Sequence, residues 1–311
     1  MIFALGLVTG ACAQPYPAKP VRLIIASAAG GGIDLLARIM APKFSEFMGQ
    51  PVIVDNRPGA GGTIGYEYGI RAAPDGYTLT IISSTYTVNP SFYPLKFDAV
   101  NDCTPISQLV KFPHVVVVHP SLPVRNIREL ITLAKANPGK ITFGSSGQGA
   151  IIHLSTELFM EKAGIRMTHV PYRGGGPALN DVIAGQISLV FAPPQTGLPQ
   201  AKAGRVRALA VTAKEPLAAE PDIPGMVQSG LPDFEVLSWH ALIGPKGLPQ
   251  AVIERVNRDI GKTVQSREVE ARVLADGVSP AASTPEVLRA RLQQEVPMWK
   301  SVVSRARIRL D

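Results

Sequence analysis

Glycines and small polar residues at strand-to-helix turns are the residues of this chain best suited to bind a ligand. Residues 27–34 read Ser-Ala-Ala-Gly-Gly-Gly-Ile-Asp and lie between the apolar run 21–26 and a helical pattern that begins near Ile33. Consecutive glycines let the backbone approach a ligand, and free N–H groups at a helix N-terminus can bind a carboxylate or phosphate without a cationic side chain. The alternative is a plain tight turn with no ligand, because this loop does not match G-x-G-x-x-G.

A second loop of the same kind occurs much later in the chain. Residues 145–150 read Ser-Ser-Gly-Gln-Gly-Ala, between a predicted strand at 141–144 and a predicted helix at 151–163. Ligands of α/β sheets lie at the carboxyl ends of the strands, which is where both loops fall. The pair of loops therefore predicts a site for a small anion.

The motifs of common enzyme classes are absent from the sequence. The stretch Gly144-Ser145-Ser146-Gly147 lacks the spacing of a serine-hydrolase elbow, and no lysine follows a glycine loop in P-loop register. The five histidines show no metal-ligand spacing. Asp34 is a candidate general base, but a carboxylate at a helix start is more often a cap. We therefore expect a protein that is not an enzyme and has no cofactor and no metal.

Length and composition indicate a folded chain of two domains. It has 311 residues, of which 46% are hydrophobic and 18% charged. The net charge of +7 is spread along the chain, apart from a C-terminal cluster at Arg305, Arg307 and Arg309. Aromatic residues make up 6% and do not interleave with basic ones, so we expect no nucleic-acid partner.

The first thirteen residues are expected to be a signal peptide. They are apolar, and Ala11-Cys12-Ala13 before Gln14 has the form of a signal-peptidase site. The basic segment that normally precedes such a run is missing, so the true start lies upstream or the signal is truncated. Lipidation of Cys12 is the alternative to cleavage after Ala13. Cleavage leaves Cys103 as the only cysteine, which excludes an internal disulfide.

Strands and helices are predicted to alternate along the chain, as in a parallel α/β sheet. Pro42 predicts a kink or restart in the first helix, and residues 84–114 are expected to be mainly loop. Two crossing segments, near 111–120 and 234–245, divide the chain into two lobes. We assign 14–115 plus 240–311 to lobe 1 and 116–239 to lobe 2, which places a hinge and a ligand cleft between them.

Motifs spread over the whole chain closely resemble the Bug substrate-binding proteins of tripartite tricarboxylate transporters. The matching motifs are Tyr16-Pro17-x-Lys19-Pro20-Val21-Arg22, Gly30-Gly31-Gly32-x-Asp34, Gln50-Pro51-Val52-x-Val54-x-Asn56-Arg57-Pro58-Gly59-Ala60-Gly61-Gly62, Ala73-Pro74-Asp75-Gly76-Tyr77-Thr78-Leu79, Leu133-Ala134-Lys135-Ala136-Asn137-Pro138-Gly139-Lys140, His169-Val170-Pro171-Tyr172-Arg173-Gly174, the run 202–212 and Ser229-Gly230-Leu231-Pro232. The resemblance implies a type II periplasmic-binding-protein fold. It also implies an exported, monomeric protein that captures a small organic acid and presents it to the membrane subunits of a transporter.

The resemblance places the ligand between the two glycine loops. In lobe 1 the contacts it implies are Ser27, Ala29, Gly31, Gly32, Ile33, Asp34, Ser84 and Tyr86. In lobe 2 they are Ser145, Ser146, Gly149, Ala150, Ile151, Tyr172, Arg173, Gly174, Ala192 and Gln195.

The sequence departs from the family pattern at several of these positions. Family members tend to have hydroxyl residues at Ile33 and at 150–152, prolines at 28–29 and Asp at Ala192. We hypothesise that the ligand is a monocarboxylate, or a dicarboxylate with an apolar or aromatic body, in preference to citrate or an amino acid. The alternative is that some of these side chains face the core. Two other functions are also considered, a ligand sensor for a two-component histidine kinase and an organic-acid enzyme.

Overall fold

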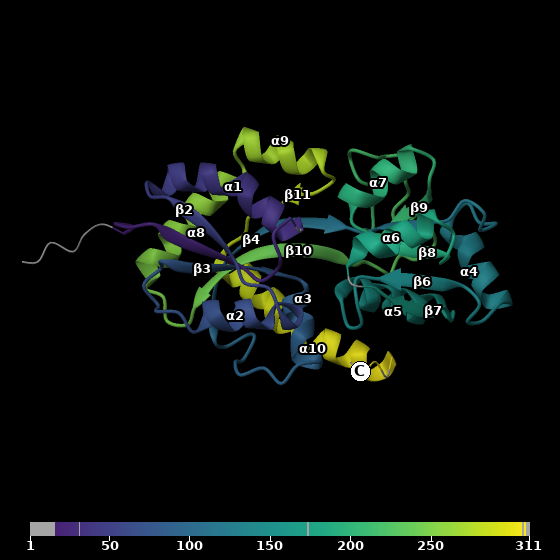
Figure 1. Ribbon diagram of the computed structural model, residues 1–311, viewed down its shortest axis with the longest axis horizontal. Helices are drawn as coiled ribbons and strands as arrows, with labels where there is room; N and C mark the ends of the chain where they lie inside the picture. Colours follow the sequence, from purple (N-terminus) through teal and green to yellow (C-terminus); the bar gives the residue numbers. More distant parts are fainter. Residues whose placement is uncertain (1–15, 31, 173, 307, 309–311) are drawn as a thin grey trace, which may run out of the picture.

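Two β-sheets, each covered by helices, form two lobes that lie side by side (Figure 1). The structure is a computed structural model that describes residues 16–30, 32–172, 174–306 and 308. The predicted signal peptide with Cys12, and the predicted ligand residues Gly31 and Arg173, lie outside the described residues.

The lobe 1 sheet has six strands in the order β11-β4-β10-β3-β1-β2. Strands β1, β2 and β3 are parallel, whereas β10 is antiparallel to both β3 and β4. The strands are β1 Val21–Ile25, β2 Val52–Asn56, β3 Thr78–Ser83, β4 Cys103–Pro113, β10 Leu237–Pro245 and β11 Ser279–Pro280.

The lobe 2 sheet has five strands in the order β7-β6-β8-β5-β9. Strands β6, β7 and β8 are parallel, and β5 is antiparallel to β8 and β9. The strands are β5 Val115–Val118, β6 Thr142–Ser145, β7 Thr168–Pro171, β8 Leu189–Ala192 and β9 Arg207–Val211. All four side chains of β5 are buried, as its continuous valine run predicts.

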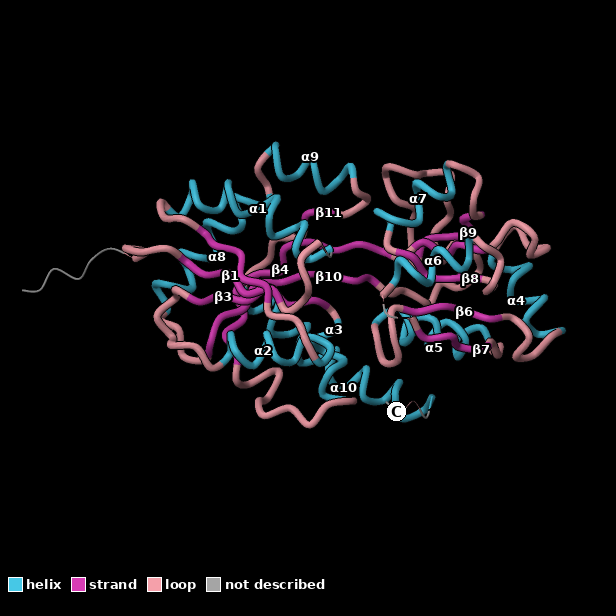
Figure 2. The backbone as a smooth tube through the Cα atoms, viewed as in Figure 1, coloured by secondary structure: helices cyan, strands magenta, loops and turns pink. Residues whose placement is uncertain are grey.

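Each sheet combines three parallel strands, as predicted, with antiparallel strands that the alternating pattern did not predict. The chain passes from lobe 1 to lobe 2 along β4 and β5 and returns along β10, which is antiparallel to β4. Figure 2 shows strand segments that connect the two lobes. Val115 pairs in the lobe 2 sheet and Leu237 in the lobe 1 sheet, whereas the predicted boundaries assign each to the other lobe. Strand β4 lies where a loop was expected.

Helices cover both faces of the lobe 1 sheet. The hydrophobic core on one face contains side chains of α1, α8 and α9, and that on the other face contains side chains of α2, α3 and α10. Helix α1 is continuous through Pro42, so no second helix begins there. The helices of this lobe are α1 Gly32–Met48, η1 Ala60–Gly62, α2 Thr63–Ile70, α3 Thr85–Val88, η2 Asn89–Ser91, α8 Gln250–Val264, α9 Arg267–Ala275 and α10 Pro285–Ala306.

Lobe 2 has one hydrophobic core, which also receives part of α10. Its own helices are α4 Ile127–Ala136, α5 Ile151–Ala163, α6 Gly175–Ile183 and α7 Pro194–Lys202. Trp299, Val302 and Val303 of α10 are buried in this core, and Arg305 pairs with Glu161 of α5 at 3.3 Å. Helix α10 is therefore a further connection between the lobes, and Figure 1 shows it extending from lobe 1 beneath lobe 2.

Thr212 joins the two crossing segments at the hinge. Its Oγ1 accepts a hydrogen bond from the N–H of His114 at 2.8 Å and donates to the carbonyl oxygen of Val236 at 2.7 Å. Its backbone N–H also donates to the carbonyl oxygen of His114, and its own carbonyl accepts from the N–H of Val236. These bonds hold the hinge segments in register next to the ends of both sheets.

Candidate functional site

The first glycine loop connects β1 to α1 in lobe 1. Gly30 has φ of 83°, a conformation that glycine adopts without strain, and Ala29 is exposed. A Cβ at Gly32, the first residue of α1, would meet no atom within 4 Å. A ligand can therefore approach the start of this helix closely. Ile33, by contrast, packs partly against the lobe 1 core.

Asp34 supports this loop from within. Its Oδ2 accepts hydrogen bonds from the N–H of Gly30 at 2.8 Å and from Arg38 at 2.9 Å, and its Oδ1 accepts from Asn56 at 3.0 Å. The Arg38 contact, followed by the Gly30 N–H, lowers the pKa of Asp34 to about 2. Because the carboxylate is 1% exposed and directed into the loop, we do not retain it as a ligand contact or a general base.

Among the described residues, the hydroxyl of Ser27 has no hydrogen-bond partner. Its carbonyl oxygen accepts from Asn56 Nδ2 at 3.1 Å, whereas its Oγ is buried and unpaired. A buried polar atom without a partner costs roughly 1–3 kcal/mol, so a ligand that paired with it would recover that cost.

The turn after β3 contributes Ser84 but not Tyr86. Ser84 and Ile151 line one cavity of about 490 Å³ that is bordered by both lobes and by α10. Tyr86 is 1% exposed, and its hydroxyl donates to the carbonyl oxygen of Ala99 at 2.8 Å. Its side chain therefore belongs to the lobe 1 core, and the expectation that it contacts the ligand is not supported.

The second glycine loop, between β6 and α5, uses several of its own amides internally. The N–H of Gly147 donates to Ser145 Oγ, and the N–H of Gly149 donates to His153 Nδ1 at 3.1 Å. Gly149 is expected to contact the ligand, but in this conformation its amide is paired with His153. Ser145 is 0% exposed and its Oγ lies 2.7 Å from His169 Nε2, so this Ser–His pair cannot reach a substrate.

The first turn of α5 has N–H groups available for a ligand. Its N-cap, Ala150, has no side-chain cap, in contrast to Asn126 of α4, whose side chain accepts from Glu129 N–H. The first N–H groups of a helix lack intrahelical acceptors, which leaves those of Ile151 and Ile152 directed out of the helix start. Ser146 is partly exposed beside them, and the Ile151 side chain packs partly against the core.

Two contacts bring the lobes together near these loops. A Cβ at Gly149 would lie 2.7 Å from the Phe92 ring, and a Cβ at Gly277 would lie 2.6 Å from Pro194. Phe92 directly follows η2, whose Asn89 donates to the Gly61 carbonyl at 3.1 Å. The turns after β2 and β3 of lobe 1 therefore lie beside the start of α5 of lobe 2.

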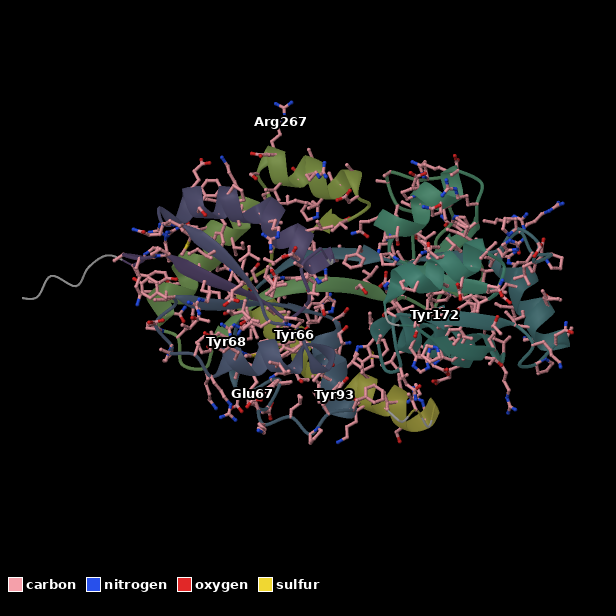
Figure 3. All side chains as sticks on the ribbon, in the orientation of Figure 1. Tyr66, Glu67, Tyr68, Tyr93, Tyr172 and Arg267 are labelled. Atoms are coloured by element: carbon pink, nitrogen blue, oxygen red, sulfur yellow. The ribbon has the colours of Figure 1, made fainter. Side chains whose placement is uncertain are left out.

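The remaining predicted residues in lobe 2 divide between the loop region and the core. Tyr172 lies in lobe 2 (Figure 3), and its hydroxyl donates to Asp181 Oδ2 at 2.6 Å. Burial, followed by this contact, raises the pKa of Tyr172 to about 12. Gly174 donates its N–H to the Ser146 carbonyl, and Gln195 is exposed at the start of α7. Ala192 is 2% exposed and belongs to the core.

Sequence reasoning did not identify four residues that shape the site. Asn56 joins Ser27 to Asp34, Phe92 covers Gly149, and His153 and His169 support the second loop. An asparagine at a strand end before a glycine-rich turn is a usable signal. Phe92 and His169 depend on partners that are distant in the sequence, whereas His153 bonds Gly149, only four residues before it.

Within the described residues, no group of three or more His, Cys, Asp and Glu is arranged to hold a metal ion. None of the helices in that part of the chain is long and apolar enough to cross a membrane.

The protein has two α/β lobes, two segments that cross between them and a glycine loop on each lobe. This arrangement defines a two-lobed receptor of the periplasmic-binding-protein class. The solved structure of the periplasmic binding protein BugD matches with a TM-score of 0.81 and 32% identity, over 94% of this chain and 99% of BugD. The predicted fold class is thereby confirmed.

The model of the tripartite tricarboxylate transporter family receptor, TctC, matches residues 36–308, and the chain belongs to this family. Protein BugT of Bordetella pertussis is 34% identical over 305 residues, which cover 97% of this chain and 94% of BugT. The predicted Bug-family membership is therefore confirmed.

Two similar solved structures contain carboxylates. The structure titled R. palustris Rpa4515 with adipate has a TM-score of 0.84 and 30% identity, over 94% of this chain and 99% of that one. MatC from Rhodopseudomonas palustris with bound malate has a TM-score of 0.80 and 27% identity, over 93% and 100% of the two chains.

Proposed function

We propose that this receptor captures a linear dicarboxylate with an apolar body, of the adipate type, in the periplasm. As a monomer and without catalysis, it presents this acid to the membrane subunits of a tripartite tricarboxylate transporter. One observation carries the proposal. Phe92, in the turn after β3 of lobe 1, lies against Gly149 just before α5, and the start of that helix has no side-chain cap. One carboxylate is held by the first turn of α5, and the other by the start of α1 and the Ser27 hydroxyl.

The preference for an apolar body rests on Ile151, whose side chain is partly exposed at the first turn of α5, where one carboxylate is held. Ile33 and Ala192 give weaker support for an apolar ligand than the sequence suggested, because their side chains pack against the hydrophobic cores of the lobes. The adipate-bound relative supports the same chemical class, since adipate has two carboxylates separated by methylene groups.

A thermal-shift panel of adipate, benzoate, malate, citrate and aspartate tests the ligand class. A ligand at about a hundred times its Kd adds roughly 2.7 kcal/mol to the free energy of unfolding, and we expect adipate to give the largest shift. A shift with citrate or aspartate and none with adipate or benzoate would show the proposed class to be wrong.

Substitution of Ser27 by Ala tests the place of binding. The Ser27 Oγ has no partner among the residues that the structure describes, so we expect Ser27→Ala to leave stability nearly unchanged while weakening adipate binding about tenfold or more. Thr80→Val is the matched control, because Thr80 Oγ1 is also buried and unpaired but lies within β3. Isothermal titration calorimetry on the three proteins measures the effect, and equal affinities in all three would contradict the proposed place.

A further inference from the structure

Two stacked histidines lie directly beneath the second glycine loop. The rings of His153 on α5 and His169 on β7 have centroids 3.7 Å apart and an interplanar angle of 10°. Phe143 of β6 flanks them, with its ring centroid 4.9 Å from that of His169. The stack therefore joins α5, β6 and β7 at the point where the loop begins and ends.

Hydrogen bonds determine which ring nitrogens carry protons. The N–H of Gly149 donates to His153 Nδ1 at 3.1 Å, so Nδ1 has no proton and the proton of the neutral ring is on Nε2, which faces Glu157 Oε1 at 3.4 Å. Protonation of Nδ1 would place two donors against each other. The contact from Gly149 to His153 thus requires a neutral imidazole.

The second histidine acts on the other end of the loop. Ser145 Oγ donates to the Gly147 carbonyl at 2.9 Å and accepts from the Gly147 N–H at 3.1 Å. With its hydrogen committed to Gly147, Ser145 Oγ accepts from His169 Nε2 at 2.7 Å. His169 thus fixes the serine that closes the tight turn at Gly147.

The charged groups around the stack lie mainly on α5. Glu157 faces His153 from the same helix, and His169 stacks on the His153 ring from β7. Strand β6 contributes the uncharged Phe143. Arg305 of α10 pairs with Glu161, farther along α5. Burial, and secondly the neighbouring His153, lower the pKa of His169 to about 4, which keeps that ring neutral at pH 7.

We propose that His153 and His169 are positioning residues that, as a neutral stacked pair, hold residues 145–150 in the conformation that presents the first turn of α5 to the ligand. Loss of the contact from Gly149 to His153 releases this loop and weakens ligand binding. The part that concerns ligand binding rests on the proposed function, whereas the support of the loop does not.

Amide hydrogen exchange of Gly149 in the ligand-free protein tests the support of the loop. His153→Leu removes the acceptor, whereas His153→Asn places an amide oxygen close to the Nδ1 position. We expect Gly149 exchange to be about tenfold faster in His153→Leu and within about threefold of the wild type in His153→Asn. His119→Asn, at a histidine that bonds Ser121 beyond β5, is the control and is expected to match the wild type. Unchanged Gly149 exchange in a folded His153→Leu protein would overturn the proposal.

Adipate titrations at pH 7.5 test the consequence for binding. At pH 7.5 we expect about tenfold weaker binding in His153→Leu and affinity close to that of the wild type in His153→Asn. Equal affinities in the wild type and a folded His153→Leu protein would overturn the role of the pair in ligand binding. If the wild type does not bind adipate, the proposed function fails, and the exchange experiment still decides whether the histidines hold the loop.

Discussion

Individual residues at the site act mainly by fixing the backbone. Asp34 places a full negative charge beside a loop expected to bind an anion, yet Arg38 balances that charge and the carboxylate is directed toward Gly30. Ser27 is held by Asn56 through its carbonyl oxygen, which leaves its hydroxyl unpaired. The site thereby combines buried supporting contacts with few side chains that are free to meet a ligand.

Replacement of Asp34 by Asn should destabilise the protein by roughly 1–3 kcal/mol at pH 7, because the ion pair and one acceptor oxygen are lost. The pKa of Asp34 is lowered from 3.8 to about 2 in the folded protein. Its contribution is therefore complete above pH of about 4 and is lost as the pH falls toward 2. Urea unfolding of the wild type and Asp34→Asn at several pH values measures this difference.

Asp55→Asn is the control for this prediction. Asp55 is a quarter exposed and pairs with Arg57, so its loss should cost at most about 1 kcal/mol. A stability difference for Asp34→Asn that stays constant from pH 7 to acid would contradict the assignment.

At the scale of elements, the hinge depends on bonds between segments that are far apart in the sequence. Thr212 follows β9 and connects the β4–β5 junction at His114 to the segment before β10 at Val236. Helix α10 joins the same region, since Trp239 Nε1 donates to Glu295 at 2.9 Å. The crossing segments therefore form one bonded unit with parts of both lobes.

Removal of the Thr212 hydroxyl should weaken this unit. Thr212→Val keeps the shape but leaves the His114 N–H and the Val236 carbonyl without a partner, at a cost of roughly 1–3 kcal/mol for each group. Thr212→Ser keeps the hydroxyl and should cost clearly less. Urea unfolding at pH 7 measures both, and equal losses would show that the hydroxyl does not join the segments.

At the scale of the whole molecule, the lobes contact each other next to the site. Phe92 lies against Gly149, Pro194 lies against Gly277, and the end of α10 is buried in lobe 2. Of these contacts, the one between Phe92 and Gly149 lies in the second glycine loop itself. A change at Gly149 should therefore affect the relation between the lobes as well as the local turn.

Gly149→Ala should cost more stability than Gly164→Ala. Both glycines have positive φ, 73° and 63°, so alanine is strained by about 1–2 kcal/mol at either position. Only the Cβ at Gly149 would also meet another residue, because nothing lies within 4 Å of the position at Gly164. Unfolding of Gly149→Ala, Phe92→Ala and the double variant measures the coupling between the lobes. We expect Phe92→Ala to relieve part of the Gly149→Ala loss, and strict additivity would contradict a contact there.

The local pattern of the sequence was enough to predict many elements. The apolar spacing of α1, the valine run of β5 and the cap of α4 each depend on residues close together in the chain, and each is found in the structure. Strand β4 was missed because Pro105, Ser107 and Gln108 interrupt any alternating pattern. Its polar groups are paired instead with Ser283, which lies far along the chain.

The sequence by itself was enough to identify the family, to predict two lobes and to locate the glycine loops. The loops could be located because turn chemistry and helix starts depend on a few neighbouring residues. Only the tertiary structure decided which groups of those loops are free. It buries Tyr86, directs Asp34 toward Gly30, and pairs the Gly149 amide with His153. The physical reason is that a hydrogen-bond donor is available to a ligand only when no other group reaches it. Asp34 and His153 each bond a loop glycine only four residues away, but Asn56 and His169, which contact the same loops, come from strands that only the folded chain brings beside them.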